Sequence, residues 1–237
     1  IDDNPWGGGA RGFSPLKGKN SFTLAEVLIT LGVIGIVAAL TLPTVIQHHK
    51  KQEATARLKK FVSTMEQAIM LSELDNGPAG DWEKQDIVWE DRDENKVDSA
   101  AQNELINKFY ARYLKKYLKT VKIDEVAPDE KSHSMIIYFA DGSTAKFYNG
   151  ACIDIQFDVN GNKNPNSSGK DIFTFLLCIE KSKLKTFHPI SNKAFGTFYE
   201  FEKREEALNE CAAKNSHCTN LLQFDNWEFK DDYPYKL

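Results

Sequence analysis

The sequence lacks the short motifs that mark several large enzyme classes. It contains no G-x-x-x-x-G-K-[ST] phosphate-binding loop, no G-x-S-x-G nucleophile turn and no H-E-x-x-H zinc motif. Histidine is scarce as well: five residues are scattered along the chain, and none has an evident catalytic partner. These absences favour a protein that is not an enzyme.

An excess of positive charge is also absent. The chain carries 30 Lys and Arg residues against 34 Asp and Glu residues, which gives a formal net charge of −4. A protein that binds nucleic acid ordinarily presents a basic excess to the phosphates. The composition therefore predicts no nucleic-acid partner. A chain of 237 residues still has room for one ordinary domain with its own core.

Cysteine is sparse, with four residues at Cys152, Cys178, Cys211 and Cys218. No C-x-x-C or H-x-x-x-H spacing accompanies them, which argues against zinc. His217 beside Cys218 would suit a thiol nucleophile, but an even number of cysteines favours disulfides wherever the region lies outside the cytoplasm. Three pairings are possible. We favour Cys152–Cys178, which would tie two strands together, and Cys211–Cys218, which closes a short local loop.

A long apolar run, by contrast, is present at residues 22–46, FTLAEVLITLGVIGIVAALTLPTVI. It is 25 residues long and carries one charge, Glu26. About 20 apolar helical residues cross the hydrocarbon core of a bilayer, and a carboxylate there costs roughly 2.5–3.5 kcal/mol. The run is longer than the apolar region of a signal peptide and lacks the polar stripe of a core helix. A plain single-span anchor is the remaining alternative, and it leaves Glu26 unexplained.

The start of this run carries a specific resemblance. The residues SFTLAEVL at 21–28 resemble the cleavage and methylation motif of type IV prepilins and type II secretion pseudopilins. Gly32, Gly35 and Pro43 fall where that family's membrane helix carries its Gly and Pro interruptions, so the resemblance implies helix breaks there on assembly. Ordinary tolerance of Gly and Pro in a membrane helix is the alternative. It covers about the first 55 residues of the chain.

The resemblance implies roles for individual residues. Cleavage of the Ser21–Phe22 bond would remove the leader, residues 1–21, and free the α-amine of Phe22 for N-methylation. Glu26 would pair with the N-terminal amine of a neighbouring subunit during filament assembly, since opposite charges that meet in lipid relieve each other's desolvation. The alternative is that Glu26, close to the start of the helix, reaches the lipid headgroups by itself. The family usually has Gly before the cleaved bond, and this chain has Ser21 there.

Composition, charge and the resemblance together predict the leader and the orientation of the span. Residues 1–21 are rich in Gly, Pro and polar residues, and we expect them to be disordered; the start at Ile1 rather than Met indicates a fragment or a processed form. Basic residues are denser after the span than before it, which by charge alone would place the C-terminal side in the cytoplasm. The resemblance implies the opposite: a leader inside, one span in the bacterial inner membrane, and an extracytoplasmic domain.

The rest of the chain predicts an α+β fold. Residues 47–75 continue the span as an amphipathic helix, with an apolar face of Leu58, Phe61, Val62, Met65, Ala68 and Ile69. Residues 76–237 form the globular domain, with a surface loop over 75–100. The predicted helices are 102–118 and 202–214. An antiparallel sheet of about four to five strands is predicted at 134–140, 144–148, 151–157, 172–179 and 194–201.

An Asx-rich loop lies between two of these strands. Asp158, Asn160, Asn162 and Asp171 place side-chain oxygens on a tight turn, which is the donor type that Ca²⁺ prefers. The loop departs from the EF-hand pattern, because Gly is at its fourth position and no Glu closes it. Metal-free Asx turns have the same composition. Calcium at these four residues is therefore one hypothesis and a metal-free turn is the other.

Together these features predict a pilin-like structural subunit, without enzymatic activity, that assembles into a type II secretion pseudopilus or a type IV pilus-like filament. Its implied partners are the membrane, a prepilin peptidase and other pilin-like subunits. The alternative is a membrane-anchored extracytoplasmic binding or enzyme domain that does not assemble.

Overall fold

The computed structural model describes residues 22–90, 93–125 and 134–237, with secondary structure but no side-chain detail over 89–97. The predicted leader, including Ser21, lies outside the described residues. The chain divides into two compact units, Ile1–Val45 and Ile46–Leu237. Each unit is described by itself below.

The first element is one long helix, α1, over Leu24–Asn76. It runs through Gly32, Gly35 and Pro43 without interruption in the single chain, and a break there on assembly stays a prediction. The helix continues through these residues because glycine only weakens a helix, and one proline removes a single backbone hydrogen bond while its neighbours keep theirs. In a membrane-type helix such residues are tolerated.

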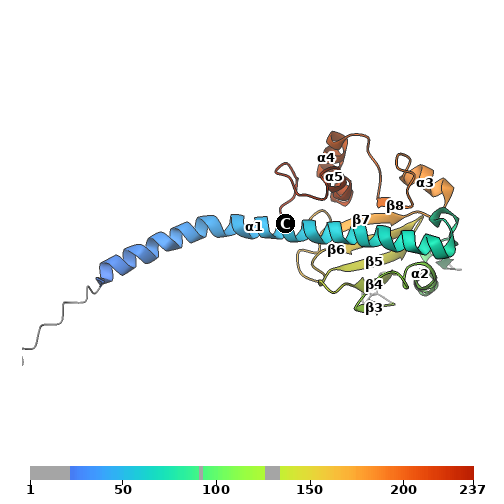
Figure 1. Ribbon diagram of the computed structural model, residues 1–237, viewed down its shortest axis with the longest axis horizontal. Coiled ribbons are helices and arrows are strands. Elements are labelled where there is room, and N and C mark those ends of the chain that lie inside the picture. The colour runs from blue at the N-terminus through green and yellow to red at the C-terminus, as the bar shows by residue number, and fades with distance from the viewer. Residues whose placement is uncertain (1–21, 91–92, 126–133) are drawn as a thin grey trace, which may run out of the picture. The chain divides into compact units, whose positions relative to one another are not determined.

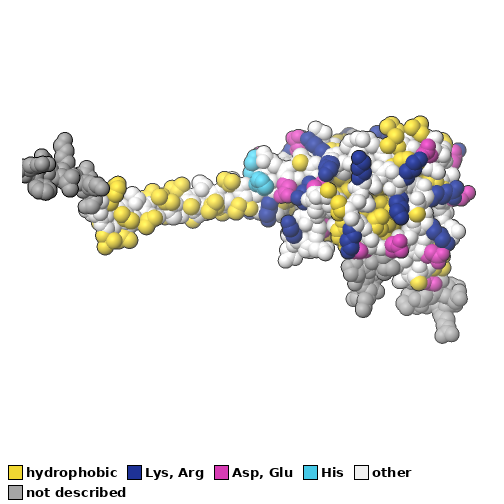
Figure 2. Space-filling view, turned by 60° about the horizontal axis from the view of Figure 1, so that its bottom comes forward, with side chains coloured by type: hydrophobic (Ala, Val, Ile, Leu, Met, Phe, Trp, Pro, Cys, Tyr) yellow, Lys and Arg dark blue, Asp and Glu magenta, His cyan; other side chains and the backbone are white. Residues whose placement is uncertain are grey.

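The part of α1 in the first unit exposes its apolar side chains, which are coloured yellow along the helix in Figure 2. Its most apolar window has a mean hydropathy of 2.3. The helix is therefore long and apolar enough to cross a membrane. Two of its hydroxyls are satisfied internally, since Thr30 Oγ1 donates to Glu26 O at 2.9 Å and Thr41 Oγ1 donates to Val37 O at 2.9 Å. The hydroxyl groups of these two threonines therefore need no hydrogen bond from water.

The part of α1 in the second unit has the predicted amphipathic character. Its buried face consists of Ala54, Leu58, Phe61, Met65, Ala68, Ile69 and Ser72. The predicted Val62 is only partly buried beside that face. Spacing of three and four residues brings these side chains onto one stripe.

This stripe packs on a six-stranded antiparallel meander, in the order β3-β4-β5-β6-β7-β8 (Figure 1). The predicted strands are confirmed with shifted ends, and the short first strand was not predicted. The strands are β3 Lys122–Asp124, β4 Ser134–Tyr138, β5 Thr144–Asn149, β6 Ile153–Asp158, β7 Ile172–Leu177 and β8 Phe195–Thr197. The α+β fold class is confirmed.

Phe61 is the centre of the contact between helix and sheet. Its ring stacks on Phe157 of β6 at a centroid distance of 4.0 Å and lies 5.2 Å from Phe175 of β7. Phe61 is 3% exposed and both partners are 1% exposed. Burying one such side chain contributes roughly 1.5–3 kcal/mol, and the aromatic contacts add to it.

The region 75–100 is more ordered than the surface loop predicted for it. It contains a 3₁₀ turn, η1 Ala79–Asp81, and a two-stranded sheet of β1 Trp89–Glu90 and β2 Asp93–Val97. Trp82 explains part of this order, because its ring is 4% exposed and stacks on Tyr113 at 4.6 Å. Trp82 is one of the few apolar residues in this polar stretch, as its sequence shows.

Helices complete the second unit. The predicted helix over 102–118 is α2, Ser99–Tyr113, which starts at an Asp98 N-cap whose side chain accepts from Ala101 N. The predicted helix over 202–214 is α4, Arg204–Ala213. The remaining helices were not predicted: α3 Lys181–Phe187, η2 Asn215–His217 and α5 Cys218–Phe224.

Candidate functional site

The N-terminal motif forms a capping box at the start of α1. Thr23 precedes the first helical residue, and its backbone N and Oγ1 donate to Glu26 Oε2 at 2.8 and 2.9 Å. In return, Glu26 N donates to Thr23 Oγ1 at 3.2 Å. This reciprocal pair satisfies backbone N–H groups that every helix N-terminus leaves open.

The capping box gives Glu26 a local role that the sequence analysis missed. The signal was available, because a Thr followed three residues later by Glu before an apolar run is the capping-box pattern. Both observed contacts use Oε2 of the Glu26 carboxylate. Its other oxygen, Oε1, accepts no hydrogen bond from the described residues. The carboxylate can therefore cap its own helix and still receive a second donor.

Two disulfides stabilise the second unit, Cys152–Cys178 and Cys211–Cys218. This is the pairing that the sequence analysis favours. The first joins the segment just before β6 to the end of β7, and the second joins α4 to α5. All four cysteines are at most 1% exposed, which fits a structural role.

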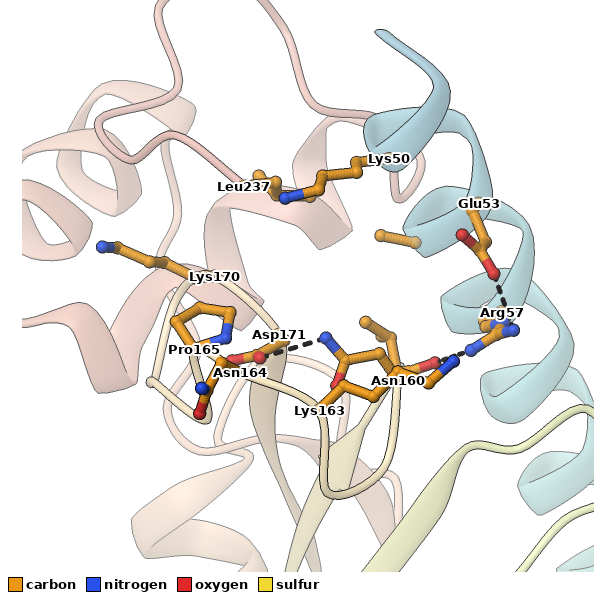
Figure 3. Close-up of a pocket in the computed structure, with 12 residues that line it drawn as sticks. Lys50, Glu53, Arg57, Asn160, Lys163, Asn164, Pro165, Lys170, Asp171 and Leu237 are labelled. Atoms are coloured by element: carbon orange, nitrogen blue, oxygen red, sulfur yellow. Dashed lines mark hydrogen bonds and ion pairs between the residues drawn. The ribbon is translucent and has the colours of Figure 1, made fainter. Parts of the chain in front are cut away.

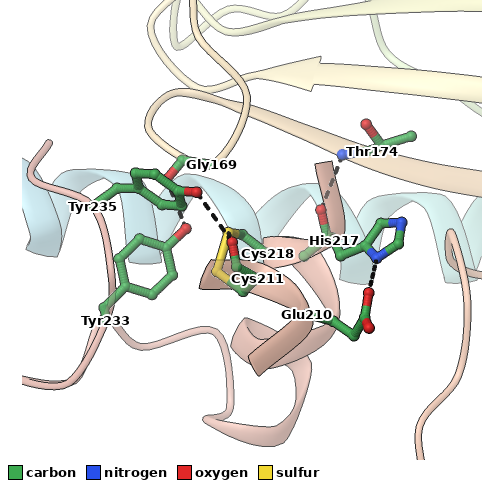
Figure 4. The surroundings of a disulfide bond; sticks show 9 residues. Gly169, Thr174, Glu210, Cys211, His217, Cys218, Tyr233 and Tyr235 are labelled. Atoms are coloured by element: carbon green, nitrogen blue, oxygen red, sulfur yellow. Dashed lines mark hydrogen bonds and ion pairs between the residues drawn. A yellow bond between two sulfur atoms is a disulfide. The ribbon is translucent and has the colours of Figure 1, made fainter. Parts of the chain in front are cut away.

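Figure 4 shows how the second disulfide helps to hold the C-terminal segment. Tyr235 OH donates to Cys211 O at 3.1 Å, and Tyr233 OH donates to Gly169 O at 2.7 Å. Gly169 has φ +76°, and a Cβ there would lie 3.1 Å from Cys218 Sγ. Only glycine suits both that backbone and that space. The end of the chain is thus fixed to the loop that follows β6.

That loop, residues 158–171, contains the predicted calcium ligands. Asp171 is 3% exposed, and its carboxylate accepts from Asn166 N at 2.8 Å, Ser167 N at 2.6 Å and Asn160 Nδ2 at 3.2 Å. Asp158 Oδ1 accepts from Asn160 N at 3.0 Å. The Asp158 contact is an Asx turn, and for both carboxylates the loop supplies the donors itself.

The arrangement does not fit a calcium ion. The structure brings Asp158, Asn160 and Asp171 together, but Asn162 is exposed. Ca²⁺ takes about 6–8 oxygen ligands, whereas N–H groups already occupy both oxygens of Asp171. Within the described residues no group of three or more His, Cys, Asp or Glu side chains could hold a metal. Asn160 Oδ1 is buried and has no hydrogen-bond partner among the described residues.

Burial and the neighbouring charge of Asp171 raise the pKa of Asp158 to about 6. Two carboxylates in one desolvated loop repel each other, so the protonated form of one of them is favoured. In the metal-free alternative, hydrogen bonds from the loop and the raised pKa of Asp158 reduce the repulsion between the two carboxylates.

A pocket of about 210 Å³ lies between this loop and α1 (Figure 3). Arg57 connects its two sides, because Nη1 donates to Val159 O while Nη2 pairs with Glu53 at 2.7 Å. Three lysines also line the pocket: Lys50, Lys163 and Lys170. In Figure 3 the Lys170 side chain extends away from the other labelled groups, so the lysines do not converge on one anion. We assign the pocket no ligand.

Comparison with known proteins gives a family match that covers the second unit of the chain. No functionally curated protein matches it, and no solved structure matches it. A long apolar N-terminal helix followed by an antiparallel sheet is a pilin-like architecture. One family pattern, that of the family of unknown function DUF6613, matches residues 44–237, which includes the whole of the second unit. The chain therefore belongs to the DUF6613 family.

Proposed function

We propose that this chain is a pilin-like structural subunit, cleaved between Ser21 and Phe22, N-methylated at Phe22 and assembled into a pseudopilus or pilus-like filament through the first half of α1. It acts without catalysis. Its partners are other pilin-like subunits, a prepilin peptidase and the bacterial inner membrane, with the sheet domain outside the cytoplasm.

The observation that carries this proposal is a carboxylate at the start of an otherwise apolar helix. The apolar side chains of that half of α1 are exposed in the single chain, so they require lipid or other subunits around them. Glu26 adds a charge that a simple anchor does not need. A neighbouring subunit's N-terminal amine would supply the missing donor to Oε1.

The apolar helix and the two disulfides support the location. Disulfides persist in oxidising compartments outside the cytoplasm, and the helix is long enough to anchor the chain. The protein is thus a membrane-anchored or secreted extracytoplasmic protein. Its placement in the inner membrane rests on the prepilin-like motif.

The capping box favours a second candidate function. If Glu26 serves only to cap α1 with Thr23, then the chain is a membrane-anchored extracytoplasmic domain that does not assemble. The two candidates differ in what they need from Glu26: assembly needs its negative charge, whereas capping needs only an acceptor at that position.

Two variants separate these needs. Glu26→Gln keeps a capping acceptor, because Gln also serves in a capping box, but removes the charge. Thr23→Val removes the cap and keeps the charge. We expect Glu26→Gln to insert in the membrane and fail to assemble, whereas Thr23→Val still assembles. The measurement is cross-linking and shearing of filaments from cells that express each variant.

Intact mass and N-terminal sequencing of the protein, co-expressed with a prepilin peptidase, complete the test. A mature start at Phe22 with one added methyl group supports the proposal. Wild-type assembly by Glu26→Gln, or a leader that stays attached, overturns it and leaves the anchored domain.

A further inference from the structure

A second and larger pocket, of about 430 Å³, lies on the face of the sheet that points away from α1. Strand alternation establishes the face. Ile155 and Phe157 point into the core with α1, while Asp154 and Gln156 of the same strand point the other way. The pocket is lined by Ile87, Tyr148, Asn149, Gly150, Asp154, Gln156, Thr174, Phe198 and Ser216.

Asp154 is the charged group of this pocket. Within the described part of the chain no donor forms a hydrogen bond or ion pair with its carboxylate. The charge that acts on it is the ammonium of Lys84, which itself donates to Gln85 O at 3.2 Å. Burial raises the pKa of Asp154 to about 6, which reflects the cost of a half-buried carboxylate without a donor.

Gly150 keeps the space beside this carboxylate open. A Cβ at position 150 would lie 2.7 Å from Asp154 Oδ2, closer than real contacts allow. The site therefore combines a carboxylate that lacks a donor with a backbone that leaves room for one. This juxtaposition does not depend on the proposed filament role.

The lining residues define the chemistry of the missing donor. Aromatic rings of Tyr148 and Phe198 border the pocket together with the carboxylate of Asp154. Aromatic faces and a carboxylate both attract organic cations. No Lys, Arg or His is among the described residues that line the pocket, so these lining residues offer no cation to the carboxylate of a free amino acid. A basic side chain whose backbone stays outside the pocket brings a cation to Asp154 and brings no carboxylate into the pocket.

We propose that this pocket is a docking site for a lysine or arginine side chain of a partner polypeptide, with the cationic end on Asp154 and the aliphatic stem between Tyr148 and Phe198. Lys84 supplies part of the compensating charge when the partner is absent. The pocket is thus an interaction site on the sheet face that α1 leaves uncovered.

The first test uses a blocked lysine, Nα-acetyl-lysine N-methylamide, titrated at millimolar concentrations into the full chain in detergent micelles. Backbone amide shifts are followed by NMR at Gln156, Thr174 and Ser216. The norleucine analogue has the same stem without the ammonium. We expect saturable shifts at these amides with lysine and none with norleucine.

Matched variants then locate the contact. Asp154→Asn keeps the shape and removes the charge, and it should weaken binding by about tenfold or more. Gly150→Val keeps the charge and fills the space, and it should also abolish binding. Asp231→Asn removes an exposed carboxylate elsewhere and should leave binding unchanged. Lys84→Met should strengthen binding, because it removes the internal competitor.

The outcomes are decisive in each direction. Binding of lysine that Asp154→Asn and Gly150→Val both remove supports the proposal. No shift at the pocket amides, equal binding of norleucine, or equal binding by Asp154→Asn overturns it. Tighter binding of free lysine than of the blocked form also overturns it, since it would indicate a small zwitterionic ligand instead of a polypeptide side chain.

Discussion

The two parts of α1 differ in how their apolar side chains are removed from water. Residues of the second unit bury one apolar stripe against the sheet and keep their charged side chains on the other faces. Residues of the first unit are apolar on all faces, and none of the residues in their most apolar window is buried. A helix that is apolar all round needs apolar surroundings that this chain does not supply. The comparison separates the half that folds the domain from the half that needs a membrane or other subunits.

The largest effect should come from breaking the contact of the second half. Phe61→Ala removes the ring that stacks on Phe157 and should destabilise the domain by about 3–5 kcal/mol, through lost burial and a residual cavity. Urea unfolding followed by tryptophan fluorescence would measure it. Ile34→Ala, in the first half, should leave that transition unchanged. Equal losses from both variants would contradict the division of α1 into two roles.

The disulfides test whether the domain depends on cross-links as well as on α1. Cys152–Cys178 spans 26 positions and Cys211–Cys218 spans 7. The chain-entropy argument assigns about 3.5 kcal/mol to the longer loop and about 2.5 kcal/mol to the shorter one. Paired Cys→Ser variants should lose stability in that order, as measured by thermal melts. The reverse order would mean that the C-terminal contacts of Tyr233 and Tyr235 depend on the shorter disulfide.

A smaller effect concerns charge on the outer face of the sheet. The folded pKa of Asp154, about 6, lies above the ordinary value of 3.8, so the native state binds more protons between these values. The stabilising effect of protonation is full below about pH 3.8 and is lost as pH rises through about 6. Asp154→Asn should therefore stabilise the domain by about 1–2 kcal/mol near neutral pH.

The same variant should have little effect at about pH 4, where Asp154 is largely protonated in the folded chain. Melting temperatures measured across this range would show the window directly. Asp158, also with a pKa of about 6, keeps its own pH dependence in the variant. A loss of stability at neutral pH would mean that Asp154 is better compensated by Lys84 than the structure indicates.

The smallest effect should be that of chelation. N–H donors already occupy the carboxylate of Asp171, so EDTA should leave the melting temperature of the domain unchanged. Added Ca²⁺ should not raise it either. A shift with either reagent would restore the calcium hypothesis for Asp158, Asn160, Asn162 and Asp171, and Asp171→Asn would then remove the shift.

Local sequence signals predicted much of the fold. The apolar stripe from Leu58 to Ile69 and the strands of the meander follow from periodicity, which depends on each segment alone. The short pieces were missed: β3 has three residues, and α3 and α5 have seven each. Such elements are too short to show a period, and they form because the sheet and the Cys211–Cys218 disulfide fix their ends.

The candidate site divides in the same way. Glu26 was evident from sequence, because a charge in an apolar run needs no structure to be noticed. The donors that surround Asp171 and the absence of a described donor to Asp154 could not be predicted, because they depend on backbone groups and strands that only the folded chain brings together.

The sequence by itself determined that this chain has an apolar helix able to span a membrane, an α+β domain and an even set of cysteines, because each is a property of composition and spacing. Only the tertiary structure decided that the Asx loop binds its own N–H groups and that Asp154 faces an open pocket. The reason is that burial and hydrogen-bond satisfaction belong to neighbours in space, and those neighbours are distant in sequence or set by local backbone geometry.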